Sequence, residues 1–155
     1  MKRCAAGLLA LVLAVGLAAC GGQRETGSRY ETEDVQAMAD AGAFSETLEE
    51  LDADTAFALY RLGEAGLERS QLTGCALLRS AGATCEEGAV LVFDTEDHAQ
   101  TAQEALERYV QGQIEANRDY RPAEIPKLED AVLDRRENTL LLAVAADTQA
   151  AKDAV

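Results

Sequence analysis

The sequence has few of the residues from which binding and catalytic sites are usually built. It contains no tryptophan, one histidine and two prolines, and aromatic residues make up only 5% of its 155 residues. Few large side chains are therefore present to line a deep ligand pocket. Basic residues are also scarce, at 14 against 28 acidic residues, and the formal charge is −14. Because binding to nucleic acid needs a surface rich in lysine and arginine, that class of function is excluded.

The first twenty residues have the pattern of an export signal. Lys2 and Arg3 give a short positive start, and an uninterrupted apolar run follows over residues 8–17. A permanent membrane helix needs roughly 20 apolar residues, so this run is too short to be one. Its length and its charged start are instead typical of a secretory signal peptide.

The residues that end this run indicate how the exported chain is held. Leu-Ala-Ala-Cys at 17–20 resembles the lipobox of bacterial lipoproteins, whose signal peptide is cut directly before a cysteine that carries a diacylglycerol thioether. Ordinary cleavage after Ala19 is the alternative, but it requires a small residue at the position of Leu17. We expect residues 1–19 to be a signal peptide and Cys20 to be lipidated, which places the protein on the extracytoplasmic face of the cell membrane.

The exported part divides into a tether and one folded domain. Residues 21–31 are polar, contain glycine and have no hydrophobic periodicity, so residues 20–31 are interpreted as the lipidated cysteine and a flexible tether. From residue 32 to 155 the chain alternates between helical and strand patterns without an internal repeat. With 48% apolar residues overall, a chain of this length can bury one core.

The pattern over 32–155 predicts an α+β fold. Short helices are expected before residue 72, including one over Phe44, Leu48 and Leu51 with Ser45 as its N-cap and one capped by Asp54. A mainly antiparallel sheet of about four strands and one long helix packed on a face follow. These elements are expected at Cys75–Leu78 and Ala89–Phe93 (strands), from Glu96 to about Asn117 (helix), at Ala131–Leu133 and Thr139–Val144 (strands), and after Asp147 (helix).

Several segments together carry a family resemblance. They are the Gly-Ala-Val-Leu-Val-Phe-Asp run at 88–94, Tyr-Arg-Pro-Ala-Glu at 120–124, Lys127-Leu128, and the last hairpin before Asp147. With the lipobox, they resemble a family of small Gram-positive bacterial lipoproteins classed as domain of unknown function 4358, over roughly residues 33–155. The resemblance implies a location and an architecture, but it implies no activity, cofactor or catalytic residue. Cys75 and Cys85 are not part of it.

Cys75 and Cys85 are the remaining cysteines of the exported chain. Two thiols outside the cytoplasm favour a disulfide. The two residues face each other if the hairpin turns at residues 80–82. If it turns nearer Thr84, Cys85 lies in the loop and the bond is lost, because a disulfide needs Cα atoms within about 7 Å of each other.

His98 is the one histidine, so any catalytic arrangement that uses histidine must include it. Asp94 lies four residues before it and Asp97 directly before it, at the predicted start of the long helix. Aspartates are common at helix starts as caps, and no nucleophile motif accompanies them. A metal site would need further ligands. We expect no catalytic residue, metal or cofactor, and keep a hydrolase or metal-dependent enzyme at Asp94, Asp97 and His98 as the alternative.

One loop combines an aromatic ring, a rigid turn and a carboxylate. Tyr120, Pro122 and Glu124 follow the long helix, where proline commonly stops a helix. The same residues form a candidate ligand loop. The sequence therefore predicts a non-catalytic binding or accessory module, anchored to the membrane through Cys20, with an envelope protein as its expected partner.

Overall fold

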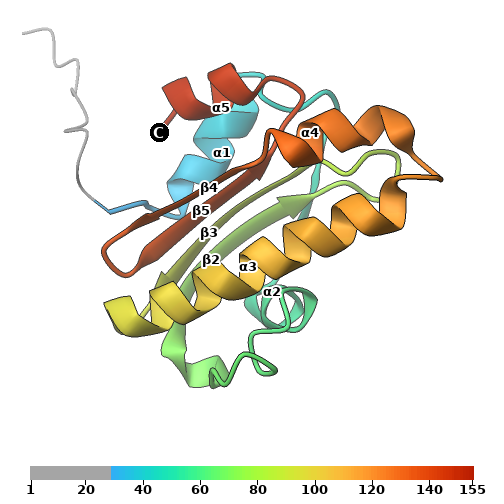
Figure 1. Cartoon of the computed structure of the whole chain (residues 1–155). Coiled ribbons are helices and arrows are strands. Elements are labelled where there is room, and N and C mark those ends of the chain that lie inside the picture. The colour runs from blue at the N-terminus through green and yellow to red at the C-terminus, as the bar shows by residue number, and fades with distance from the viewer. Residues whose placement is uncertain (1–28) are drawn as a thin grey trace, which may run out of the picture.

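The computed structural model describes residues 29–155 (Figure 1). The predicted signal peptide, the predicted lipidation at Cys20 and most of the predicted tether lie outside the described residues. Tyr30 is already part of the fold, since its side chain is 3% exposed and its backbone N–H donates to the hydroxyl of Thr139 at 3.0 Å. The domain therefore begins earlier than the boundary at residue 32 that the sequence pattern predicted.

A five-stranded antiparallel sheet forms the centre of the molecule. Its strand order is β1-β2-β3-β5-β4, so two hairpins, β2–β3 and β4–β5, join along β3 and β5. The predicted α+β class and antiparallel sheet are confirmed, with one strand more than the four expected. The strands are β1 (Glu49–Leu51), β2 (Leu72–Arg79), β3 (Glu87–Phe93), β4 (Val132–Arg136) and β5 (Thr139–Val144).

Helices cover both faces of this sheet, which makes a three-layer arrangement. The core on one face includes side chains of α2, α3 and α4, and the core on the other face includes side chains of α1 and α5. In Figure 1 the sheet runs between α3 and the α1–α5 pair. The helices are α1 (Glu33–Asp40), α2 (Ala53–Leu59), α3 (Glu96–Asn117), α4 (Ile125–Glu129) and α5 (Thr148–Asp153), with 3₁₀ turns η1 (Arg69–Gln71) and η2 (Pro122–Glu124).

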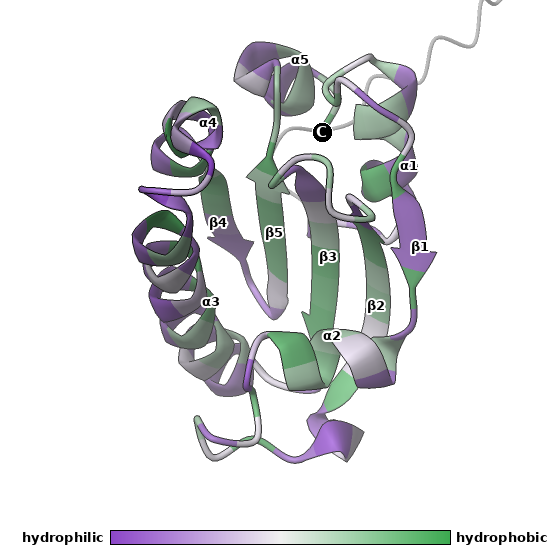
Figure 2. Ribbon diagram, turned by 90° about the vertical axis from the view of Figure 1, so that its right-hand side faces the viewer, coloured by the Kyte–Doolittle hydropathy of each residue, from purple (hydrophilic) through white to green (hydrophobic). Residues whose placement is uncertain are grey.

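The two central strands are apolar because both of their faces are covered. On β3, Leu91 packs toward α3 and Val90 toward α1, and every residue of β5 is buried. A strand covered on both faces has a continuous apolar run in place of alternation. Figure 2 shows this apolar character concentrated in β3 and β5. The edge strands β1 and β4 carry charged residues, which discourage pairing with another chain.

The long helix α3 has the bounds that the sequence predicted. Thr95 caps it by accepting a hydrogen bond from the His98 N–H at 3.2 Å, and Glu96 and Asp97 occupy its first turn, where acids favour the helix dipole. Small buried alanines on one side let its backbone lie close to the sheet. Among residues 29–155, no helix has both the length and the apolar character needed to cross a membrane.

The helix predicted over Phe44, Leu48 and Leu51 is wrong. The chain there is irregular and ends in the short strand β1, which pairs with β2. Ser45, expected as an N-cap, instead bonds to the carboxylate of Glu86 across the fold. These long-range bonds satisfy polar groups that a helix would have satisfied locally. The next helix, α2, is capped by Asp52 and not by Asp54.

Candidate functional site

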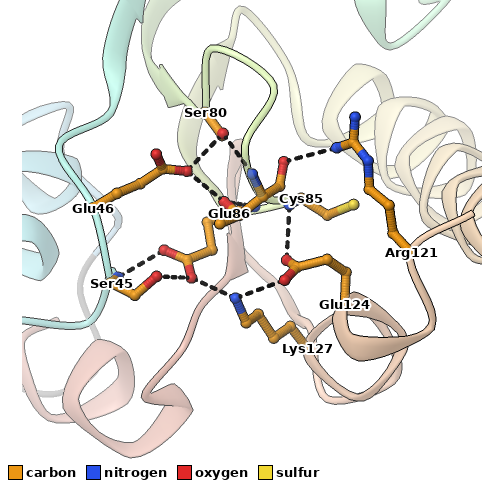
Figure 3. Close-up of polar contacts among 9 residues, drawn as sticks. Ser45, Glu46, Ser80, Cys85, Glu86, Arg121, Glu124 and Lys127 are labelled. Carbon is orange, nitrogen blue, oxygen red and sulfur yellow. Dashed lines mark hydrogen bonds and ion pairs between the residues drawn. The ribbon is translucent and has the colours of Figure 1, made fainter.

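A buried carboxylate ties together three segments at the end of the β2–β3 hairpin (Figure 3). Glu86 is fully buried and accepts hydrogen bonds from the Ser45 N–H at 2.7 Å, the Ser45 hydroxyl at 2.6 Å and Lys127 Nζ at 2.7 Å. A buried carboxylate is tolerated only when it is paired and hydrogen-bonded in this way. Glu86 therefore fastens the segment before β1 and the helix α4 to the hairpin.

Lys127 joins this carboxylate to the candidate ligand loop. Its ammonium group also contacts Glu124 Oε1 at 3.1 Å, and Glu124 Oε2 accepts the backbone N–H of Cys85 at 2.9 Å. Burial disfavours the charged lysine, but the bonds to Glu86 and Glu124 outweigh it and raise the pKa of Lys127 above its ordinary value. The ammonium group stays charged and holds both carboxylates.

A third carboxylate closes the loop of the same hairpin. Glu46 Oε1 accepts from the hydroxyls of Ser80 and Thr84, each at 2.7 Å, and these bonds lower the pKa of Glu46. The Ser80 hydroxyl in turn accepts the N–H groups of Gly82 and Thr84. Together with Glu86 and Lys127, these contacts hold the hairpin end in one conformation (Figure 3).

The structure separates the three residues of the predicted ligand loop. Glu124 points into the network just described, and Pro122 begins η2. Tyr120 lies outside the network and is 87% exposed. The loop thus has a firmly held base and one exposed aromatic ring. The sequence could not indicate this division, because the partners of Glu124 are far away along the chain.

A second buried carboxylate lies between the sheet and α3. Glu87 accepts the hydroxyl of Tyr60 at 2.9 Å, the hydroxyl of Tyr109 at 2.7 Å and Arg79 Nε at 3.1 Å. Burial raises the pKa of Glu87, although these donors act in the opposite direction. Burial also raises the pKa of Tyr60 and Tyr109, so both phenols remain donors. Carboxylates with perturbed pKa values are candidates for functional sites.

A groove lies over these two tyrosines, between α3 and the turns that follow α2. It encloses about 730 Å³. The residues that line it are Leu59, Tyr60, Arg61, Glu64, Ala65, Ala105, Arg108, Tyr109, Gly112 and Gln113. Sequence reasoning missed this groove. The available signal was a glycine in the middle of the predicted helix, Gly112, three residues after Tyr109. This signal did not show which other segment packs there.

Cys75 and Cys85 are free thiols in the structure, so the disulfide alternative is wrong. The register pairs Cys75 with Leu91, while Cys85 lies beyond the last pair of the hairpin, Arg79 with Glu87. The turn therefore lies late, near Thr84, and Cys85 is in the loop. Burial raises the pKa of Cys75 to about 11 and also raises that of Cys85. Neither thiol is activated as a nucleophile.

His98 has two polar neighbours at the start of α3. Its Nδ1 lies 2.6 Å from Asp94 Oδ1, and its Nε2 lies 3.1 Å from the side-chain amide of Gln71. The backbone carbonyl of Asp97 accepts a hydrogen bond from the Thr101 hydroxyl, and the Asp97 side chain makes no hydrogen bond or ion pair with His98. Within residues 29–155, no three histidine, cysteine, aspartate or glutamate side chains cluster as metal ligands would. The three predicted residues thus form one pair, Asp94 with His98.

Comparison with known protein families identifies the family to which this chain belongs. A family model described as domain of unknown function (DUF4358) matches residues 44–145. The chain belongs to this family. The match covers β1 through β5, and with them the groove, the hairpin end and the Tyr120 loop. Searches of curated proteins and of solved structures found no match.

Proposed function

We propose that this family member is a lipid-anchored, extracytoplasmic module that binds a protein partner and catalyses no reaction of its own. The anchor is the diacylglycerol group at Cys20, and residues 21–28 connect it to the domain. The observation that carries the binding role is Tyr120, an exposed aromatic ring on a loop whose base is fixed by Glu124 and Lys127. The lipid anchor and the extracytoplasmic location rest on the sequence pattern at 17–20.

Tyr120 has the properties of an anchor residue at a protein interface. Tyrosine presents a large contact area and loses little conformational freedom on binding, and it is enriched among the residues that dominate binding energy. Its loop does not have to be ordered at the moment of binding, because Glu124 already accepts the Cys85 N–H and pairs with Lys127. Preorganisation of this kind lowers the cost of association.

The net negative charge of the chain indicates the kind of partner surface that it favours. The chain carries a formal charge of −14, so a basic protein surface is favoured and an anionic bilayer is not. Association with a basic partner weakens as the salt concentration rises.

Site-specific photocrosslinking in the native host tests the partner role. A photoreactive residue in place of Tyr120 is expected to give a discrete adduct with one protein, and the yield falls with added salt. The matched control is the same residue in place of Glu104, which is also exposed on the surface but lies far along α3. The absence of an adduct at position 120, or an identical adduct at both positions, would overturn the proposal.

The anchor has its own test. The Cys20→Ser variant is expected to lose incorporation of labelled fatty acid and to leave the membrane fraction or keep its signal peptide. Wild-type protein that is secreted freely and takes up no label contradicts lipidation.

A further inference from the structure

The groove over Tyr60 and Tyr109 has a rigid floor. The two rings meet edge to face with centroids 5.0 Å apart, and both hydroxyls are held by Glu87. One wall is a single face of α3, formed by residues 105, 108, 109, 112 and 113, and the other wall is the chain over 59–65. Its volume of about 730 Å³ lies within the range of small-molecule binding sites.

Gly112 places no side chain on the part of α3 that lines the groove. A glycine in the interior of a helix costs helix stability relative to alanine. At Gly112 no atom lies within 4 Å of the place that a Cβ would occupy, so close packing does not require glycine here. The residue leaves open space above the floor of the groove.

Arg61 occupies a left-handed backbone position after a helix, and it shares positive φ with one other described residue that is not glycine, Glu137 in the β4–β5 turn. Arg61 has φ +53° and directly follows the C-cap of α2, Tyr60. There the Leu62 N–H donates to the carbonyl of Phe57 and the Arg61 N–H donates to the carbonyl of Ala58. The same pattern of bonds recurs at Gly42 and at Gly66. Because the left-handed conformation strains an arginine and does not strain a glycine, the backbone conformation does not explain why position 61 is an arginine.

The charges of the groove differ from those of the rest of the chain. Arg108 makes no hydrogen bond or ion pair with any residue of 29–155, although acids outnumber bases twofold in the sequence. Among the described residues Arg61 forms an ion pair only with Glu64, at 3.8 Å, and both side chains are about three-quarters exposed. Two guanidinium groups are thus available at one groove, and each has the planar fork that binds an oxyanion through two hydrogen bonds.

We propose that this groove binds a small organic ligand that carries an oxyanion, a carboxylate or a phosphate, between Arg61 and Arg108. The body of the ligand lies on the Tyr109 ring above Gly112, and the amide of Gln113 is placed to bond its neutral polar groups. Tyr120 does not line the groove, so the inference is independent of the partner role proposed above.

Arginine side-chain NMR on the full-length protein in detergent tests this site. Three probes share one sugar ring: glucuronate carries a carboxylate, glucose 6-phosphate carries a phosphate, and glucose is neutral. At least one of the two anions is expected to shift the Nε–H resonances of Arg61 and Arg108, while glucose shifts neither. Which anion acts identifies the source of the oxyanion. The inference is overturned if neither anion moves these two resonances, or if glucose moves them equally.

Variants then locate the site. Arg108→Ala is expected to weaken binding of the active probe by about tenfold, the usual effect of losing a charge-assisted bond. Arg118→Ala, which removes an exposed arginine of the C-terminal end of the same helix, is the matched control and leaves the affinity unchanged. Gly112→Leu fills the groove without removing a charge and is expected to abolish binding. Wild-type affinity in Arg108→Ala or in Gly112→Leu would show that the anion binds elsewhere.

Discussion

Replacing Arg61 by glycine is expected to stabilise the protein. A residue other than glycine in the left-handed conformation costs roughly 1–2 kcal/mol, and Arg61 has φ +53°. Glycine also gives the unfolded chain more conformational freedom, which offsets roughly 0.5–1 kcal/mol of this stabilisation. The lost ion pair with Glu64 is highly exposed and is worth only a few tenths of a kcal/mol, roughly. The net gain is about 0.5 kcal/mol, which corresponds to about 2 °C in Tm for a domain of this size.

Two further variants separate backbone strain from charge. Arg61→Ala removes the same charge but keeps a Cβ in the left-handed conformation, so its stability is expected to stay near that of the wild type. Gly66→Ala places a Cβ at φ +92°, in open space, and is expected to lose about 1 kcal/mol through the backbone alone. Urea unfolding of the three variants beside the wild type measures these differences. The reasoning is refuted if Arg61→Gly is no more stable than Arg61→Ala.

Three other predictions concern the buried polar groups. Lys127→Met leaves Glu86 buried without its cation and is expected to cost about 3 kcal/mol in urea unfolding; a loss below about 1 kcal/mol contradicts this. Glu87 has a raised pKa, so wild-type protein is expected to gain stability relative to Glu87→Gln as the pH falls from neutral to about 4, and a difference independent of pH contradicts this. Cys75 and Cys85 should both alkylate slowly without a reductant, as measured by mass, because burial raises the pKa of each thiol.

The elements that the sequence predicted correctly are those whose signals are local. The helix over 96–117 begins with a capping threonine and two acids and repeats its apolar positions over 22 residues. The strands of both hairpins are short apolar runs that loop residues separate. In each case one stretch of chain contains both the periodicity and its stop signals, so no distant contact is needed to identify the element.

The elements and sites that the sequence missed depend on contacts between distant residues. Phe44, Leu48 and Leu51 have a helical spacing, but Ser45 bonds to Glu86, which lies 41 residues away. Tyr60 and Glu87 are 27 residues apart, and neither has a neighbour in sequence that predicts their hydrogen bond. A single sequence shows which residues are polar, but only the packing of the sheet against α2, α3 and α4 shows which of them meet.

The groove is lined by two residues that depart from the usual backbone preferences of their residue types. Gly112 stands inside a helix where alanine would fit, and Arg61 stands in a left-handed position where glycine would fit. Each choice is unfavourable for stability on its own, by about 1 kcal/mol at Gly112 and by about 0.5 kcal/mol at Arg61, and simple substitutions would remove both costs. The two positions come from separate segments, and both line the groove between α3 and the chain over 59–65. Costs that stability does not explain are expected where a site must stay open or hold a charge, which favours the groove as a site of function.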